Sequence, residues 1–118
     1  MTKRNRDFSM HLGESKTVFI SLLNEDGTPF DSAGSTFEWW LAKTSHSDKL
    51  LQKKLGAGLV LDTGGINVIL NSADTYDLIP ELYYHELKIY LGSTGLSVST
   101  VGTVHLRPAL DMRVVVNP

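Results

Sequence analysis

The sequence predicts an all-β fold, an antiparallel β-sandwich or small barrel of about eight strands. Three observations predict it: apolar residues recur at every second position in several short runs, turns with glycine and proline separate the runs, and helical spacing is limited to one turn. The 118 residues are enough for one domain with its own hydrophobic core. Because no helical crossover is available to build a parallel sheet, we expect the strands to be antiparallel.

Three parts are expected along the chain. The first residues read as a basic arm, because Lys3, Arg4 and Arg6 are opposed only by Asp7. Alternation of apolar and polar residues begins at Phe8 and marks the start of the folded part. The parts are an N-terminal arm at 1–7, a β-sandwich domain at 8–107 and a C-terminal extension at 108–118.

Strands are expected where apolar and polar residues alternate or where β-branched and aromatic residues gather. These segments are 8–12, 17–23, 36–44, 51–54, 59–61, 66–70, 83–91 and 100–106, with a single helical turn as the alternative for 51–54. In the third segment Trp39 and Trp40 lie on opposite faces, so one is expected in the core and the other partly exposed; we assign a structural role to Trp39 and an interaction role to Trp40. Gly27 and Pro29 belong to a strong turn signal after the second segment, and 62–65 reads as a hairpin turn.

One helical turn precedes the seventh segment. Ser72 can cap its start, Asp74 suits the positive end of the helix dipole, and Pro80 disfavours helix at the residue before it. Tyr83 then opens the strand, which resembles the tyrosine corner of immunoglobulin-like sandwiches, where the hydroxyl bonds back to the backbone just upstream. The alternative is that Tyr83 is simply a packed aromatic residue. The corner would make the fold an immunoglobulin-like sandwich.

Composition and charge limit the classes of function. Hydrophobic residues make up 42% and charged residues 20% of the chain, which is ordinary for a globular domain. A net charge of −2 argues against a general attraction to nucleic acid, and no apolar run approaches the roughly 20 residues that span a bilayer. The chain has no cysteine and no signal-peptide pattern, so we expect a reducing cytoplasm and neither a nucleic-acid nor a membrane partner.

Asp62, Thr63 and Gly64 follow an apolar run and resemble the catalytic loop of aspartic proteases. In a dimeric protease of this kind, Asp62 would supply one of two carboxylates that share a proton. Gly65 departs from the Ala or Ser that usually follows, and the family's second element, an apolar pair before a glycine and a helix, has no good match. The same residues form a natural hairpin turn, which is the interpretation we adopt, with the protease as an alternative.

The histidines and acidic residues do not form a metal-binding pattern. His85 is the one polar residue in the inward set of its strand, and it could meet His105 across paired strands. Glu86 could not assist such a pair because it points to the opposite face. Each histidine is expected to be a surface or half-buried residue, and the acidic residues within 74–81 to form a solvated turn. No catalytic, cofactor-binding or metal-ligating residue is therefore assigned.

The two ends of the chain offer contacts for other proteins. The valines at 114–116 have high β-propensity, and left exposed they would favour aggregation. They are expected to add a strand to the domain's own sheet edge or to that of a neighbour. The candidate protein-interaction residues are Lys3, Arg4, Arg6, Trp40, Val114, Val115 and Val116.

The core resembles a domain that is common in structural proteins of tailed bacteriophages. The resemblance spans about residues 9–107 and follows the segments GESKTVFISLLNEDGTPFDSAGSTFEWWLAK, GLVLDTGGINVILNSADTYDLIPELYYHELKIY and VSTVGTVHLRP. The matching positions in the first segment are Asp26, Gly27, Pro29, Asp31, Gly34 and Trp39. Those in the other two are Asp74, Thr75, Leu78, Pro80, Tyr83, Glu86, Leu87 and Gly102, with His85 where a tyrosine or aspartate is common.

This resemblance implies an immunoglobulin-like, non-enzymatic virion protein, either a head-decoration or neck component or a part of the tail or baseplate. Such a protein would assemble in the cytoplasm of the bacterial host through its sheet edges and terminal arms. Its partners would be other virion proteins and further copies of itself, so that many weak contacts add in a symmetric particle. The alternative is a carbohydrate-binding or adhesion module in which Trp39 or Trp40 stacks on a sugar. Neither interpretation implies a cofactor.

Overall fold

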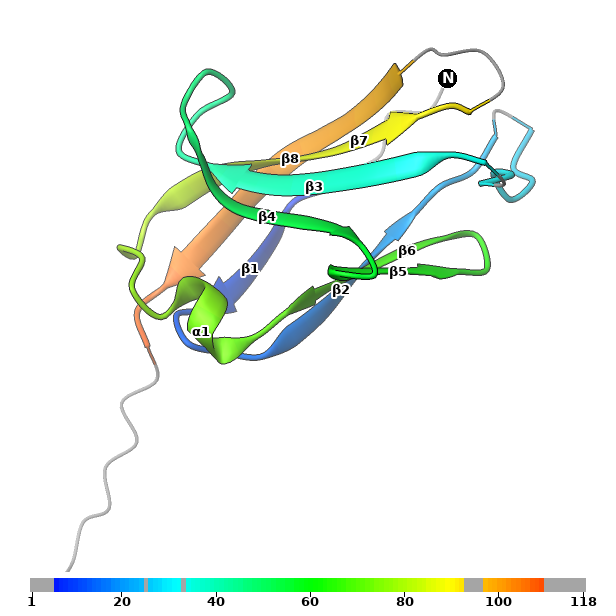
Figure 1. Ribbon diagram of the computed structural model, residues 1–118. Coiled ribbons are helices and arrows are strands. Elements are labelled where there is room, and N and C mark those ends of the chain that lie inside the picture. The colour runs from blue at the N-terminus through cyan, green and yellow to red at the C-terminus, as the bar shows by residue number, and fades with distance from the viewer. Residues whose placement is uncertain (1–5, 25, 33, 93–96, 110–118) are drawn as a thin grey trace, which may run out of the picture.

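The computed structural model describes residues 6–24, 26–32, 34–92 and 97–109. Its strands are β1 (Phe8–His11), β2 (Lys16–Ser21), β3 (Thr36–Ala42), β4 (Lys49–Leu55), β5 (Gly58–Asp62), β6 (Gly65–Leu70), β7 (Leu82–Tyr90) and β8 (Ser97–Arg107). A single helical turn, α1 (Ser72–Thr75), lies between β6 and β7. The prediction of an all-β domain with one helical turn is confirmed (Figure 1).

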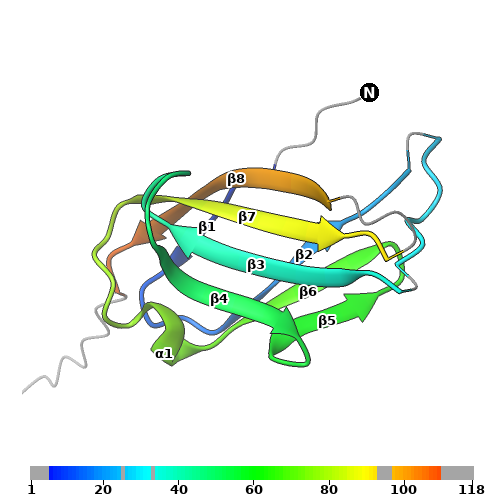
Figure 2. The same cartoon turned by 45° about the horizontal axis from the view of Figure 1, so that its top comes forward.

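The strands form one sheet in the order β1-β8-β7-β3-β4-β5-β6-β2. The sheet curls around the core, so that β8, β7, β3 and β4 make one layer and β5, β6 and β2 make the other, as Figures 1 and 2 show. β1 and β2 stand at the two ends of this order, and no pairing joins them within the described residues. The sheet is therefore barrel-like but not fully closed.

Two strand pairs are parallel, which corrects the expectation of a wholly antiparallel sheet. β1 runs parallel to β8, with Phe8 opposite Val104. The first and last strands can pair in this way because the rest of the domain connects them, so no helical crossover is needed. β4 and β5 share a short parallel contact at Lys54 and Gly58, where positive φ angles at Gly56 (80°) and Gly58 (104°) let the chain coil beside itself.

Trp39 lies at the centre of the core. It is opposite Leu87 of β7 on one side and Lys53 of β4 on the other, and it is 1% exposed. Trp40, the next residue, is half-buried on the outer face, as the alternation predicted. The buried hydrophobic cluster draws on both layers and contains Met10, Ile20, Phe37, Trp39, Leu41, Leu59, Ile66, Val68, Leu70, Tyr83, Leu87, Ile89, Val104 and Leu106.

The turn after β2 is built around Gly27 and Pro29. Gly27 has a φ of 87°, a left-handed conformation that favours glycine, and Pro29 forms an antiparallel bridge with Leu23. The Asp26 carboxylate accepts hydrogen bonds from the Thr28 hydroxyl at 2.6 Å and from its backbone N–H at 2.9 Å. These two hydrogen bonds lower the pKa of Asp26. The turn predicted here is therefore confirmed.

β4 contains an almost buried lysine that the sequence did not reveal. The strand is longer than the predicted 51–54, and Lys53 is its buried side chain at 9% exposed. Lys53 Nζ lies 2.8 Å from Asp74 Oδ2, and the same oxygen accepts a hydrogen bond from the backbone N–H of Asn71 at 2.7 Å. The N-cap of α1 is thus Asn71 rather than Ser72, and Asp74 ties the helical turn to β4.

Replacing Asp74 by alanine is expected to lower the unfolding free energy by about 2–3 kcal/mol. The change leaves the Lys53 ammonium almost buried without its counter-ion and also removes the acceptor of the Asn71 N–H. Lys53→Met should cost less, because an apolar side chain fills the space of the lysine stem and Asp74 stays bonded to Asn71. Urea unfolding of both variants measures the difference, and a larger loss for Lys53→Met would contradict this role of Asp74.

The tyrosine corner predicted at Tyr83 is present as a hydrogen bond. The Tyr83 hydroxyl donates to the carbonyl oxygen of Ile79 at 2.6 Å, while the residue as a whole is 2% exposed. Burial raises the pKa of Tyr83, and the charge of Glu81 raises it further. α1 ends at Thr75, and Pro80, which disfavours helix at Ile79, follows it before the corner. The corner therefore fixes how the chain enters β7.

Tyr83→Phe removes only the hydroxyl and is expected to lower the unfolding free energy by about 1–2 kcal/mol, since the Ile79 carbonyl loses its partner. Tyr90→Phe is the matched control, because Tyr90 is exposed at the end of β7. Its effect should stay within about 0.5 kcal/mol. Thermal unfolding at neutral pH measures both changes, and equal losses would mean that the corner does not stabilise the domain.

Candidate interaction site

The predicted interaction residues fall into two groups. Lys3, Arg4 and the valines at 114–116 lie outside the described residues. Arg6 and Trp40 are described, and they are found in different surroundings. Arg6 lies beside β8 and contacts the opposite layer, whereas Trp40 lies on the outer face of β3. The two are therefore treated separately.

Arg6 bridges two strands that belong to different layers. Its Nε donates a hydrogen bond to Thr100 Oγ1 of β8 at 3.1 Å, and a terminal nitrogen lies 3.5 Å from Ser21 Oγ of β2. β8 and β2 are not neighbours in the sheet, so the guanidinium spans the open side of the barrel-like fold. The sequence placed Arg6 in an arm for partner contacts, whereas in the structure its side chain contacts its own domain.

His85 is a fully buried polar residue next to Arg6, at 1% exposed. Its Nδ1 accepts a hydrogen bond from the indole N–H of Trp39 at 3.1 Å, and its Nε2 lies 2.7 Å from the carbonyl oxygen of Arg6. An indole N–H only donates and a carbonyl only accepts, so the imidazole is neutral and carries its proton on Nε2. Burial lowers the pKa of His85, which favours the same neutral form. His85 thus joins β3, β7 and the N-terminal segment.

Gly102 lets the N-terminal segment approach His85. It lies opposite His85 in the β7–β8 ladder, and a Cβ there would come within 2.7 Å of the Arg6 carbonyl oxygen and 2.8 Å of His85 Nε2. The Arg6 carbonyl binds His85 rather than the backbone of β8. The N–H of Thr103 in β8 donates instead to the side chain of Asp7, at 2.8 Å from Oδ1. Backbone pairing of β1 with β8 begins one residue later. Gly102 therefore has a steric role.

The structure corrects one expectation about the histidines and removes one possibility. The sequence predicts a surface or half-buried His85, but the residue is buried because it stands in line with the inward-facing Tyr83. His85 and His105 do not meet, since the register places His85 opposite Gly102 and His105 opposite Leu82. The alternation of β7 already placed His85 on the inner face. Its partners could not be read from the sequence, because they lie far away along the chain.

Trp40 lies among charged side chains on the outer face. The Lys49 ammonium is 4.4 Å from the centre of its ring and 2.6 Å from Glu38 Oε1. A cation above the face of a tryptophan is attracted by the negative potential of the ring. Any partner that stacks on this face of Trp40 must therefore displace Lys49 or include it in the contact.

A second polar group continues this outer face across β7 and β8. Glu86, opposite Trp40 in the β3–β7 ladder, accepts a hydrogen bond from the Tyr84 hydroxyl and another from Ser99 Oγ at 3.0 Å. Burial and the hydrogen bond to Glu86 raise the pKa of Tyr84 to about 12. The surroundings of Trp40 are consequently an ordered polar surface rather than a continuous apolar patch.

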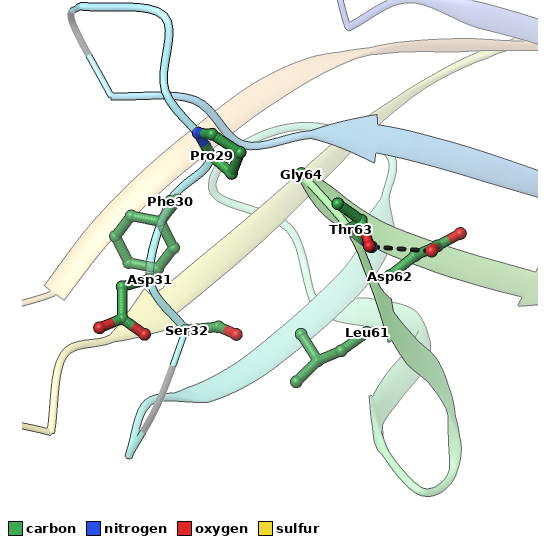
Figure 3. Close-up of a pocket in the computed structure, with 8 residues that line it drawn as sticks. All are labelled: Pro29, Phe30, Asp31, Ser32, Leu61, Asp62, Thr63 and Gly64. Carbon is green, nitrogen blue, oxygen red and sulfur yellow. Dashed lines mark hydrogen bonds between the residues drawn. The ribbon is translucent and has the colours of Figure 1, made fainter.

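Asp62 ends β5 at the hairpin turn that leads into β6, as the turn interpretation predicted. Its Oδ1 accepts the backbone N–H of Thr63 at 2.7 Å, and its Oδ2 accepts the side-chain amide of Asn67 at 3.3 Å. Asp62 and Asp31 line a hollow of about 480 Å³ between this turn and the loop after β2. Figure 3 shows that their carboxylates point to opposite sides. They do not form a pair that shares a proton.

Two of the three acidic residues within 74–81 contact lysines of the same domain. Asp74 binds Lys53, and Glu81 Oε1 lies 3.5 Å from Lys43 Nζ. In the part of the chain that the structure describes, no three His, Cys, Asp or Glu side chains are grouped to hold a metal ion. Across the same residues, no helix is long and apolar enough to cross a membrane.

Comparisons with known proteins add no family to this description. No protein-family model matches the chain, and no curated protein matches it.

Proposed function

We propose that this chain is a non-enzymatic structural protein of a tailed-bacteriophage virion, placed at the head surface, the neck, the tail or the baseplate. It is built on an immunoglobulin-like sandwich and joins other virion proteins and further copies of itself through sheet edges and terminal segments. The resemblance of its turns and core positions to bacteriophage structural domains supports this role. Its location is the virion, which is assembled in the bacterial cytoplasm.

Strand order supports the immunoglobulin-like assignment. In such sandwiches a central strand carries a buried tryptophan, and a tyrosine corner opens the strand beside it, two residues before the second cysteine of antibody domains. Trp39 lies in β3 and Tyr83 opens the neighbouring β7. His85, two residues after Tyr83, takes the place of that cysteine, and its hydrogen bond with Trp39 replaces the packing of tryptophan on a disulfide. This cysteine-free core suits folding in a reducing cytoplasm.

The observation that carries the proposed assembly role is the open sheet. β1 and β2 stand at the ends of the strand order, and each pairs on one side only within the described residues. Unpaired backbone groups at a sheet edge are a ready template for a strand from another chain. A symmetric particle offers many such contacts at once, so each one can be weak.

Antibody labelling of purified particles in the electron microscope tests this role. An antibody raised against the purified chain should bind intact or gently opened particles at symmetry-related positions, and the labelled position distinguishes head, neck, tail and baseplate. Labelling of particle-free fractions alone would contradict the proposal.

A carbohydrate-binding or adhesion module is the second candidate, because the ring of Trp40 is partly exposed. It predicts saturable glycan binding that Trp40→Ala abolishes and Tyr90→Phe preserves. The dimeric aspartic protease predicts instead a peptidase activity that Asp62→Asn removes. Glycan binding of this kind, or such a peptidase activity, would replace the structural role.

A further inference from the structure

Only part of one edge of β8 is paired with another strand within the described residues. β8 spans Ser97–Arg107, which is longer than the predicted 100–106, and pairs with β7 from Ser97 to His105. On its other side β1 pairs with it only from Val104 to Arg107. Within the described residues, no backbone partner lies along this side from Ser97 to Val101. Among the residues that the structure describes, this stretch of sheet edge is therefore open.

The open groups can be assigned from the register. The N–H of Thr103 points away from β7, because it donates to Asp7 at 2.8 Å. Backbone groups of every second residue point to the same side, and the β7–β8 register is continuous over this stretch. The N–H and C=O groups of Ser97, Ser99 and Val101 therefore face outward from this edge.

The side chains of this edge carry none of the features that usually prevent pairing with another chain. The stretch reads Ser-Val-Ser-Thr-Val, with no charge and no proline, and Val98 and Val101 are 51% and 49% exposed. Edge strands of monomeric proteins usually carry lysine, proline or a bulge that prevents pairing with another chain. The uninterrupted β7–β8 register shows no such bulge here.

We propose that Ser97–Val101 pairs antiparallel with the same residues of a second copy, about a two-fold axis at Ser99. In this register Ser97 faces Val101 of the second copy and Ser99 faces itself, so the outward-pointing groups of both chains meet as hydrogen-bonded pairs. The five edge residues carry no charge of their own, so self-pairing brings no like charges directly opposite each other, and the neighbouring Arg6 guanidinium is held by Thr100 Oγ1 and Ser21 Oγ. The two β8 strands then join the β8-β7-β3-β4 layers of both copies into one continuous sheet.

A single engineered thiol tests the register, because the chain has no cysteine of its own. Ser99→Cys places two thiols opposite each other across the axis, at a Cα separation of about 5.5 Å that suits a disulfide. Ser45→Cys, in an exposed turn between β3 and β4, is the control. Under mild oxidation the Ser99→Cys protein should form a disulfide-linked dimer at least about tenfold faster than the control. Equal rates would overturn the proposed pairing.

Ser99→Pro tests the backbone contact. Proline removes the outward N–H without removing a hydrogen bond between β7 and β8, and proline is tolerated at edge strands. Ser99→Ala keeps the N–H and loses only the hydroxyl that binds Glu86. By sedimentation, the dimer dissociation constant should rise about tenfold or more for Ser99→Pro and stay near wild type for Ser99→Ala. Unchanged association of a folded Ser99→Pro protein would contradict the model.

The N-terminal segment is the rival occupant of this edge. This segment is residues 1–5, which precede in the chain the β1 residues that pair with β8. A wild-type monomer at roughly 100 μM that becomes a dimer when residues 1–5 are deleted would assign the edge to that segment and overturn our proposal. The inference deepens the proposed assembly role and rests on it, but different results contradict each of them. Missing antibody labelling of particles would contradict the virion role, whereas equal cross-linking rates of Ser99→Cys and Ser45→Cys would contradict only the pairing through this edge.

Discussion

Trp39→Ala is expected to lower the unfolding free energy by about 3–5 kcal/mol, a large part of the total for a domain of this size. The side chain is 1% exposed between β4 and β7, so its removal leaves a cavity that the surrounding layers cannot fill. The change also strips His85 Nδ1 of its hydrogen-bond donor. His85, which binds the Arg6 carbonyl of the N-terminal segment, is therefore disturbed together with the core.

Urea unfolding followed by circular dichroism measures this loss, with two controls. Trp40→Ala removes a tryptophan from the same strand but from its outer face, and it should cost about 1 kcal/mol or less. Trp39→Phe keeps an aromatic ring and loses the indole N–H, so its cost should fall between the two. A loss for Trp39→Ala no larger than that for Trp40→Ala would contradict the place of Trp39 in the core.

Acid is expected to destabilise the domain through His85, beginning below pH about 6.5. Burial lowers the pKa of His85 in the folded state; the hydrogen bond to the Arg6 carbonyl and the nearby Asp7 oppose this shift, and the Arg6 charge adds to it. Above about pH 6.5 His85 is neutral in both the folded and the unfolded state, so its contribution to stability is fully present. As the pH falls further, the unfolded chain takes up a proton that the folded chain resists, and stability drops by up to about 1.4 kcal/mol per pH unit until the folded pKa is reached.

His85→Leu separates this effect from the titration of other groups. At pH 7.5 it should cost about 2–4 kcal/mol, because the Trp39 indole N–H and the Arg6 carbonyl lose their partner. Between pH 6.5 and about 5 its stability should depend less on pH than that of the wild type. His46→Gln, at an exposed position in a turn, should keep the wild-type slope. A wild-type slope in His85→Leu would show that another group causes the acid sensitivity.

Local patterns predicted most of the elements. The hairpin turn after Asp62, the turn at Gly27 and the outward position of Trp40 each depend on neighbours within a few residues. Turn chemistry and period-two alternation act over that range, so the sequence contains the necessary signal. The Tyr83 corner also belongs here, because its acceptor Ile79 lies four residues away.

The features that the sequence did not predict depend on contacts between distant residues. Lys53 looks like a surface residue until Asp74 of α1, 21 residues further along the chain, is placed beside it. The carbonyl that His85 binds belongs to Arg6, 79 residues earlier. The parallel pairing of β1 with β8 joins the two ends of the domain. Tertiary structure, rather than local propensity, decides such contacts.

The open edge of β8 at residues 97–101 was predictable only in part. The uncharged composition of 97–101 is visible in the sequence, but an open edge is defined by what pairs with it. Pairing of β1 with β8 starts at Val104, just beyond Gly102, over which the Arg6 carbonyl reaches His85. These are contacts between residues far apart in the chain, so local sequence patterns do not predict where the edge lies.

The copy number of this chain in purified virus particles tests the virion role most directly. Quantitative mass spectrometry should find the chain at a fixed ratio to the other particle proteins, because symmetric assembly sets the number of sites. Roughly hundreds of copies would indicate the head surface or tail tube, and about a few to a few dozen the neck or baseplate. Absence of the chain from particles, with the other structural proteins present, would contradict the proposed role.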